Sequence, residues 1–348
     1  MRKFWSVLFL LVNVTAYAAS FDCAKATTPQ EKAICASPKL SAADDQITAA
    51  YKAALAQTPT GMTAGVRDDQ RAWLHRTALR CPAVGKNAVA DLNECLNTDY
   101  EARTKQLKSL VVHQGDVTFV WRSIAVSTKD TPDPGDPVCA QEDVPGSSTL
   151  NAFWPQANSD APEWKAWNLA LESAARRVDQ SDKKVPVATW EKALRGSQDS
   201  DSEVTVSLRS VGKQVVTASI EDFQMGHCAP YPNVTAMQFN WLLAEQRELL
   251  AKDVFRVGSG WEQALVKGCR DVLIPQIRKD GGKIEGNDVL KALHTIVADP
   301  HNWQMDAKGL SIFFGNSEDL NHAEIPDPIT IPWAALKPVL QTSFAQPQ

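Results

Sequence analysis

The first third of the chain carries apolar residues at helical spacing. Between residues 28 and 110 they recur every three or four positions, with short breaks that contain proline or glycine. This periodicity predicts four helices, over residues 28–36, 41–57, 66–80 and 87–110. The first helix has a defined start, because Thr28 is followed by Pro29 and then, three positions after Thr28, by Glu31. That order is typical of a capping box with proline at the first helical position.

The pattern changes after Leu110. Alternating runs rich in β-branched and aromatic residues predict strands, and two of these runs meet at Gly212 in a hairpin. The strands are expected over residues 117–126, 203–211, 213–224, 235–242, 309–314 and 329–333. Helices are expected over residues 161–179, 261–277 and 287–297. Strands and helices without regular alternation favour an α+β fold.

Residues 1–18 have the pattern of a secretory signal peptide. Arg2 and Lys3 give a basic start, an apolar run follows from Phe4 to Val14, and Ala16-Tyr17-Ala18 supplies an A-x-A cleavage site. The alternative is an uncleaved membrane anchor, for which the apolar run is short. No other stretch reaches the roughly 20 apolar residues of a membrane span. We therefore expect cleavage after Ala18, export to the periplasm or secretion, and no membrane span afterwards.

Export to an oxidising compartment favours disulfides. Four of the seven cysteines, Cys23, Cys35, Cys81 and Cys95, lie in the predicted helical region and allow three connectivities. Closing the loop of about 15 residues between Cys81 and Cys95 is worth roughly 3 kcal/mol. We predict this pair together with Cys23–Cys35, which ties the N-terminal extension to the first helix. The expected fold is a small disulfide-stapled all-α N-terminal domain, residues 21–110, plus an α+β C-terminal domain, residues 115–345.

The other three cysteines lie in the predicted C-terminal domain. Cys228 follows His227, which raises a metal site or a Cys–His dyad as an alternative, but no CxxC, HxH or HExxH motif accompanies them. We predict instead a disulfide between Cys228 and Cys139, since both lie in proline-rich loops. Cys269 is then expected to stay unpaired and buried on the helix predicted over residues 261–277.

Several short segments of the helical region form a distinctive set. They are FDCAKA, EKAIC, PKLSAADDQITAAYKAAL and QRAWL, followed by a cysteine and then by CL with a tyrosine and an arginine downstream. Together they resemble the LprI-type lysozyme-inhibitor domain of exported bacterial proteins, over residues 21–110. The resemblance implies an envelope protein with a helical, disulfide-bonded domain that inhibits c-type lysozyme.

Three segments of the second region form another set. They are FWPQANSDAPEWKAWNLALESAAR, the stretch of residues 250–265, and DAKGLSIFFGN followed by ITIPWAALKPVL. They are similar to the extracellular domain of RsiV-like anti-sigma factors and PdaC-type envelope proteins. The chain departs from that family in its three cysteines and in an acidic loop at residues 197–203. Because RsiV-like members sense lysozyme by binding it, the resemblance implies a second lysozyme-linked domain.

The sequence contains no recognisable catalytic constellation. It lacks the GxSxG and P-loop motifs. The carboxylate pairs Asp44/Asp45 and Asp68/Asp69 suggest general acid–base chemistry, but both fall near predicted helix N-termini, where capping explains them. We therefore expect a protein that is not an enzyme and that needs no cofactor or metal.

Charge is divided unevenly along the chain. Residues 19–110 carry 12 basic and 10 acidic side chains, whereas residues 111–348 carry 22 basic and 31 acidic ones, a net charge of −9. This acidity argues against nucleic acid as a partner, because proteins that bind it carry basic patches. It favours a cationic partner instead.

These observations predict an exported bacterial envelope protein that binds lysozyme-type muramidases, with inhibition of the enzyme as a further expectation. Lysozyme is strongly basic, so the acidic half would raise the rate of encounter. The expected contacts are the loops 58–65 and 82–88, since loops can enter a groove. The alternative is a non-catalytic envelope module for peptidoglycan fragments or another protein partner. A third hypothesis is a hydrolase of cell-wall glycans or peptides.

Overall fold

The computed structural model of the chain describes residues 19–83, 88–129, 147–175, 200–226, 229–315, 320 and 325–344. Their contacts divide the chain into two compact units. The helical unit comprises the described parts of residues 1–56 and 81–109, and the sheet unit comprises those of residues 57–80 and 110–348. The predicted fold class is confirmed, because a helical region with two disulfides precedes a region of strands and helices.

The helical unit contains a short 3-10 turn and three helices. They are η1 (Cys23–Lys25), α1 (Pro29–Ala36), α2 (Pro38–Gln57) and α4 (Ala88–Lys108). The predicted start of α1 is confirmed, with Thr28 at the N-cap and both bonds of the capping box to Glu31 present. Helix α2 begins three residues earlier than expected, because Pro38 serves as its first residue as well as ending α1.

Helix α3 (Thr63–Arg80) follows the 3-10 turn η2 (Thr60–Met62) and contacts the sheet. The Nη1 atom of Arg76 donates to Oδ1 of Asn151 at 2.6 Å, and both side chains are buried. The hydroxyl of Ser123 donates to the Asp69 carboxylate. Because of contacts such as these, α3 belongs to the sheet unit and not to the unit that contains the other predicted N-terminal helices. The domain limits 21–110 and 115–345 stay a prediction.

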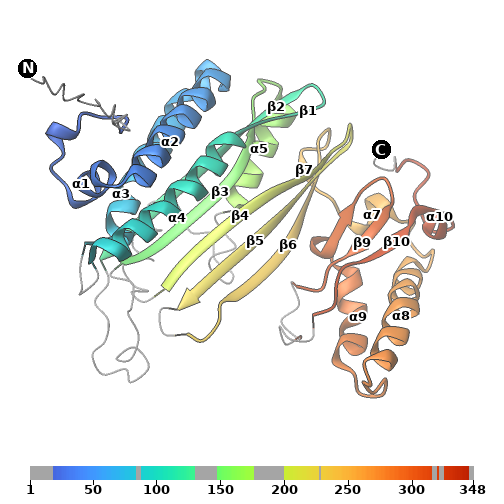
Figure 1. The fold of residues 1–348 in the computed structure, drawn as a ribbon. Helices are drawn as coiled ribbons and strands as arrows, with labels where there is room; N and C mark the ends of the chain where they lie inside the picture. Colours follow the sequence, from blue (N-terminus) through green and yellow to red (C-terminus); the bar gives the residue numbers. More distant parts are fainter. Residues whose placement is uncertain are drawn as a thin grey trace, which may run out of the picture. The chain divides into compact units, whose positions relative to one another are not determined.

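The sheet unit is built on a seven-stranded sheet whose strands lie in chain order (Figure 1). The strands are β1 (Val111–Gln114), β2 (Val117–Lys129), β3 (Ser147–Ala157), β4 (Ser200–Val211), β5 (Val215–Gly226), β6 (Asn233–Leu242) and β7 (Arg247–Glu248). All neighbours pair antiparallel except β3 and β4, which are parallel. The predicted turn at Gly212 joins β4 to β5. Strands β1 and β7 were not predicted. Strand β3 was expected only through the segment at residues 153–176, which resembles an early strand and helix of the RsiV-like family.

The connection between the parallel strands β3 and β4 includes helix α5 (Pro162–Ala175). Parallel neighbours need such a crossover, because a tight turn cannot return the chain to the same end of the sheet. Helix α5 buries Trp164 and Trp167, whose rings meet Phe119 of β2 edge-on, with centroids 5.7 and 5.6 Å apart. These rings form part of the apolar core between α5 and the sheet.

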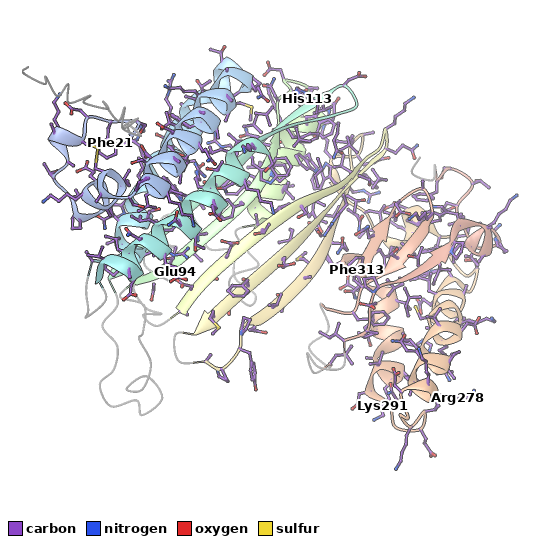
Figure 2. All side chains as sticks on the ribbon, viewed as in Figure 1. Phe21, Glu94, His113, Arg278, Lys291 and Phe313 are labelled. Atoms are coloured by element: carbon purple, nitrogen blue, oxygen red, sulfur yellow. A yellow bond between two sulfur atoms is a disulfide. The ribbon has the colours of Figure 1, made fainter. Side chains whose placement is uncertain are left out.

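The C-terminal part of the sheet unit has its own apolar core. Its elements are α7 (Ala251–Val254), α8 (Trp261–Lys279), α9 (Asp288–Ala298), η4 (Pro300–Asn302), β8 (Trp303–Met305), β9 (Gly309–Ile312), β10 (Ile329–Pro332) and α10 (Trp333–Leu336). The three strands form an antiparallel sheet in the order β10-β9-β8. Helices α8 and α9 lie side by side, and Arg278 and Lys291 mark the end at which they connect (Figure 2).

A buried asparagine joins the two sheets. Asn240 of β6 accepts a hydrogen bond from the Thr217 hydroxyl at 2.9 Å, and its Nδ2 atom donates to the carbonyls of Pro300 and Trp303 at 3.1 and 2.7 Å. Every polar atom of this amide therefore has a partner. Such a satisfied polar side chain fixes the position of β8 against β6 without leaving an unpaired group in the core.

Candidate functional site

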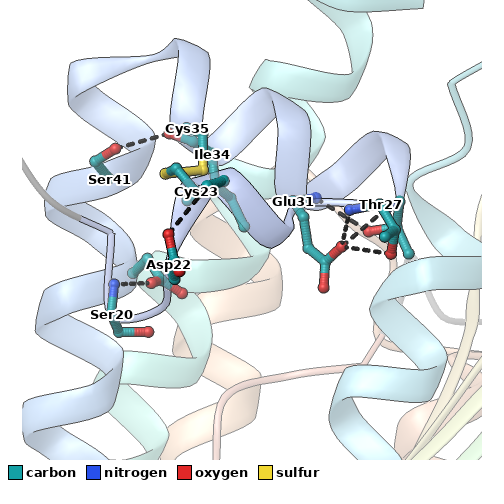
Figure 3. Close-up of a disulfide and its surroundings, with 11 residues drawn as sticks. Ser20, Asp22, Cys23, Thr27, Glu31, Ile34, Cys35 and Ser41 are labelled. Carbon is teal, nitrogen blue, oxygen red and sulfur yellow. Dashed lines mark hydrogen bonds between the residues drawn. A yellow bond between two sulfur atoms is a disulfide. The ribbon is translucent and has the colours of Figure 1, made fainter.

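Two disulfides hold the helical unit. Cys23 is bonded to Cys35 and Cys81 to Cys95, with Cα atoms 5.8 and 5.6 Å apart. The first fastens the turn η1 to α1 (Figure 3), and the second closes the connection into α4. A further hydrogen bond, from Nε2 of Gln30 to the carbonyl of Cys81 at 3.0 Å, links α1 to the second disulfide. The two cross-links therefore restrain the same small group of helices.

Of the three remaining cysteines, the structure describes only Cys269. Cys269 is a free thiol, fully buried on α8, and burial raises its pKa to about 12. A thiol of this kind stays protonated at neutral pH and behaves as a small apolar side chain. Cys139 and Cys228 lie outside the described residues, as does His227, so the Cys139–Cys228 pair stays a prediction.

The start of α1 is an exposed, charged cap. One oxygen of Glu31 accepts from the backbone N–H groups of Thr27 and Thr28 at 2.7 and 2.9 Å (Figure 3). These bonds to the ionised form lower the pKa of Glu31 to about 2. Residues 22–25, just before this cap, are exposed and are tied by Cys23 to α1. The N-terminal turn is thus both accessible and rigidly attached.

A group of polar side chains lies inside the helical unit between α2 and α4. Asp44, Asp99 and Arg103 are buried, with 7%, 8% and 2% of their surfaces exposed. Burial, with smaller contributions from the charges of Asp44 and Asp99, raises the pKa of the neighbouring Tyr100. The Arg103 guanidinium donates to Gln106 at 2.6 Å. The whole Arg103 side chain, including its charged end, is therefore buried in the helical unit.

The carboxylate pairs singled out in the sequence have structural roles that differ from helix capping. Helix α2 begins at Pro38, so Asp44 lies in its second turn and accepts a hydrogen bond from the Ser20 N–H instead. Helix α3 begins at Thr63, so Asp68 and Asp69 also lie beyond the first turn. Asp68 pairs with Arg71, while Asp69 accepts from Ser123. The prediction of capping at these positions was therefore wrong, because both helices start earlier than their sequence signals indicate.

The two predicted contact loops differ from expectation. Residues 58–65 are not a free loop, because Thr60–Met62 forms a 3-10 turn and α3 starts at Thr63. Met62 is buried, and this apolar contact turns the segment inward. Of the second loop, Pro82 and Ala83 are described and exposed, whereas residues 84–87 lie outside the description. The exposed N-terminal turn at residues 22–25 was not singled out from the sequence.

One histidine of the sheet unit bridges two carboxylates. Nδ1 of His301 lies 2.8 Å from Asp299, and Nε2 lies 3.1 Å from Glu248 at the end of β7. The hydrogen bond to Asp299, followed by the one to Glu248, raises the pKa of His301 to about 10. Burial raises the pKa of Asp299, but hydrogen bonds from the side chain and the backbone N–H of His301 outweigh burial and lower this pKa overall. Asp299-Pro300-His301 is a partial signal in the sequence, because an aspartate precedes a proline, but Glu248 lies 53 residues from His301.

Arg247, which precedes Glu248 in β7, forms a second ion pair. The guanidinium of Arg247 donates through both terminal nitrogens to Asp253, at 2.7 and 2.8 Å. The same carboxylate accepts from the N–H of Leu250 at the start of α7. These bonds lower the pKa of Asp253 and, with His301, join β7 to the elements around it. Both features link β7 to neighbouring elements.

Neither metal chemistry nor a membrane span is indicated in the part of the chain that the structure describes. No group of three or more histidine, cysteine, aspartate or glutamate side chains there could hold a metal ion. Among the same residues, no helix combines the length and the apolar character needed to cross a bilayer.

Comparison with known proteins supports the resemblance found in the helical region. Residues 23–107 match the family model described as "Lysozyme inhibitor LprI". No match was found among curated proteins. The predicted similarity of the N-terminal region to LprI domains is therefore confirmed at the level of the family.

Two solved structures of the DUF3298 family are similar to a larger part of the chain. One, from Bacteroides fragilis NCTC 9343, is 12% identical and has a TM-score of 0.46, covering 66% of this chain and 95% of its own. The other, from Pseudomonas aeruginosa PAO1, is 11% identical with a TM-score of 0.47, covering 66% of this chain and 97% of its own. The chain is thus similar to the LprI family over residues 23–107 and, at a distance, to DUF3298 proteins over two thirds of its length.

Proposed function

We propose that the protein is an exported bacterial envelope protein that binds lysozyme-type muramidases and inhibits them. The observation that carries the proposal is the match of residues 23–107 to the family model of the lysozyme inhibitor LprI. The two disulfides support export, because such bonds form and persist in oxidising compartments. The signal-peptide pattern of residues 1–18 gives the route to the periplasm or beyond.

The charge distribution supports a basic enzyme as the partner. Residues 111–348 carry a net charge of −9. An acidic surface attracts a strongly basic protein such as lysozyme and raises the association rate more than the final affinity. Association should therefore slow as salt is added, since the Debye length falls from about 10 Å at 0.1 M to about 3 Å at 1 M.

The N-terminal turn is the contact element that we favour in the helical unit. Residues 22–25 are exposed, and the Cys23–Cys35 bond holds them in one position against α1. A segment that is already ordered loses little conformational entropy when it binds, so it is suited to enter an enzyme cleft. We favour this turn over residues 58–65 as the contact element, because those residues form a 3-10 turn and the start of α3.

A turbidity assay tests the proposal directly. Purified full-length protein is added to c-type lysozyme and a suspension of cell walls, and lysis is expected to slow with increasing protein. The matched variant replaces Cys23 and Cys35 together by serine, which releases residues 22–25 and should weaken inhibition. Lysis at an undiminished rate with a micromolar excess of the parent protein would contradict the proposal.

A pull-down on purified sacculi separates the proposal from the alternative of a peptidoglycan-binding module. Retention on sacculi without any effect on lysozyme would favour the alternative. Release of muropeptides by the protein alone would instead favour a hydrolase.

A further inference from the structure

The N-terminal end of the described chain is fixed inside the helical unit. Ala19 has only 7% of its surface exposed. The N–H of the next residue, Ser20, donates to Oδ2 of Asp44 at 2.8 Å (Figure 3). Asp44 is itself buried on α2. The residue that directly follows the predicted cleavage point is therefore held beside a buried carboxylate.

The buried charges of the helical unit do not balance. Among its described residues the buried charged side chains are two carboxylates, Asp44 and Asp99, and one guanidinium, Arg103. A buried charge without a counter-charge is costly, because it has lost its hydration. One further positive charge next to Asp44 would make this group neutral. No lysine or second arginine is buried in the described part of the unit.

We propose that export processing supplies this charge: the α-ammonium group of Ala19, formed by cleavage after Ala18, pairs with the carboxylate of Asp44. In the cleavage, a signal peptidase adds one water across the Ala18–Ala19 peptide bond. The C–N bond breaks, the carbonyl carbon of Ala18 gains the hydroxyl and becomes a carboxylate, and the nitrogen of Ala19 becomes an ammonium.

The reach of this group follows from covalent geometry. Three bonds of about 1.3–1.5 Å join the nitrogen of Ala19 to that of Ser20, so the two atoms are less than about 4 Å apart. Because the Ser20 nitrogen already lies 2.8 Å from Asp44, a rotation about the bonds of Ala19 brings the ammonium into contact with the carboxylate. In the unprocessed chain the same nitrogen is an uncharged amide.

The pairing makes the helical unit more stable in the processed protein than in its precursor. A chain that still carries its leader lacks the α-ammonium charge beside Asp44, whose carboxylate accepts from the Ser20 N–H. Processing would thus complete the unit at the point of export. The inference rests on the export that the proposed function includes and does not depend on lysozyme binding.

The test compares two forms of the full exported chain, one beginning at Ala19 and one carrying a Gly-Ser-Gly-Ser extension before it. The extension moves the ammonium away from Asp44. Amide hydrogen exchange in α2 and α4 should be about tenfold faster in the extended form. A tenfold change corresponds to about 1.4 kcal/mol, which is the expected loss for one charge-assisted contact. In Asp44→Asn the extension should change exchange less than twofold. Asp45→Asn, at the exposed neighbour of Asp44, should behave like the parent.

A second measurement keeps the test decisive if Asp44→Asn folds poorly. An aldehyde reagent selective for α-amines should label native parent protein more slowly than it labels the extended form. Lysozyme inhibition can fail while both measurements succeed, so the two proposals are separable. An exported chain that begins at a residue other than Ala19, or equal exchange in the processed and extended parent forms, would overturn the inference.

Discussion

The helical unit and the sheet unit are each stabilised by different kinds of interaction. The helical unit combines two disulfides with buried charges, and its helices are lined largely by alanine, leucine and isoleucine. The sheet unit has two apolar clusters that include the rings of Phe119, Trp167, Phe255 and Trp303. Large rings bury far more apolar surface per residue than alanine does. A unit with a small core depends more on cross-links than a unit with aromatic clusters does.

The largest expected effect lies in the sheet unit. Trp303 is fully buried, stacks edge-on against Phe255 and Trp261, and donates from its ring N–H to the Val297 carbonyl. Replacing Trp303 by alanine should lower the free energy of unfolding by about 3–5 kcal/mol. Urea unfolding followed by hydrogen exchange in β8 and β9 measures it.

The matched control for this substitution is Val257→Ala, at a side chain that is 87% exposed. It should leave the urea midpoint unchanged. Exchange in α2 and α4 should be similar in Trp303→Ala and in the parent. A parallel loss in both units would show that they share one cooperative transition and would break the comparison.

The next effect lies in the helical unit. Replacing Cys81 and Cys95 together by serine should destabilise this unit by about 3 kcal/mol, because the unfolded chain regains the freedom of the open loop. Hydrogen exchange in α4 measures the loss. Cys269→Ala removes a thiol that forms no cross-link and serves as the control. Equal effects of the two changes on α4 would contradict a special dependence of the helical unit on its disulfides.

The helical unit was also the more predictable of the two from sequence. Its signals are local: Thr28, Pro29 and Glu31 specify the start of α1 within four residues, and the structure has that start. The errors arose where a local signal has two meanings. Pro38 ends one helix and begins the next, so the predicted start of α2 came three residues late.

The sheet unit was predicted less completely because its edges depend on distant partners. The hairpin of β4 and β5 was visible in its alternation and in Gly212. Periodicity did not reveal strand β3, which contains Trp154-Pro155 and pairs along its whole length with β2. Only the resemblance of residues 153–176 to an early strand and helix indicated it. The His301 cluster was also not predicted, because Glu248 comes from β7 and Asp299 from the turn before β8. Periodicity cannot reveal which residues a sheet will bring together.

A smaller effect should distinguish the units by their response to alkali. The pKa of His301 is raised to about 10. A group whose pKa is raised on folding stabilises the protein below its unfolded pKa of about 6.5, and this contribution is lost as pH rises through the folded value. The sheet unit should thus lose stability between about pH 6.5 and 10. The loss should be about 1 kcal/mol or less, because His301, Glu248 and Asp299 are 40%, 44% and 40% exposed.

The measurement is the urea midpoint of the sheet unit at pH 6 and pH 9, for the parent and for His301→Gln. The variant should show a smaller difference between the two pH values. His294→Gln, at an exposed histidine of α9, is the matched control. A parent protein that is equally stable at both pH values would contradict a role for His301 in joining β7 to η4.

The smallest effect is expected at the other end of the pH scale, in the helical unit. Hydrogen bonds from Thr28 and Thr27 lower the pKa of Glu31 from 4.5 to about 2. A group whose pKa is lowered on folding stabilises the protein above its unfolded pKa, and the contribution is lost as pH falls from about 4.5 towards 2. Glu31→Gln keeps an acceptor oxygen but has no charge to lose, so exchange in α1 should depend less on pH in this range. Glu94→Gln, at an exposed carboxylate of α4, should follow the parent profile. If Glu31→Gln and the parent respond to acid alike, the charged cap does not stabilise α1.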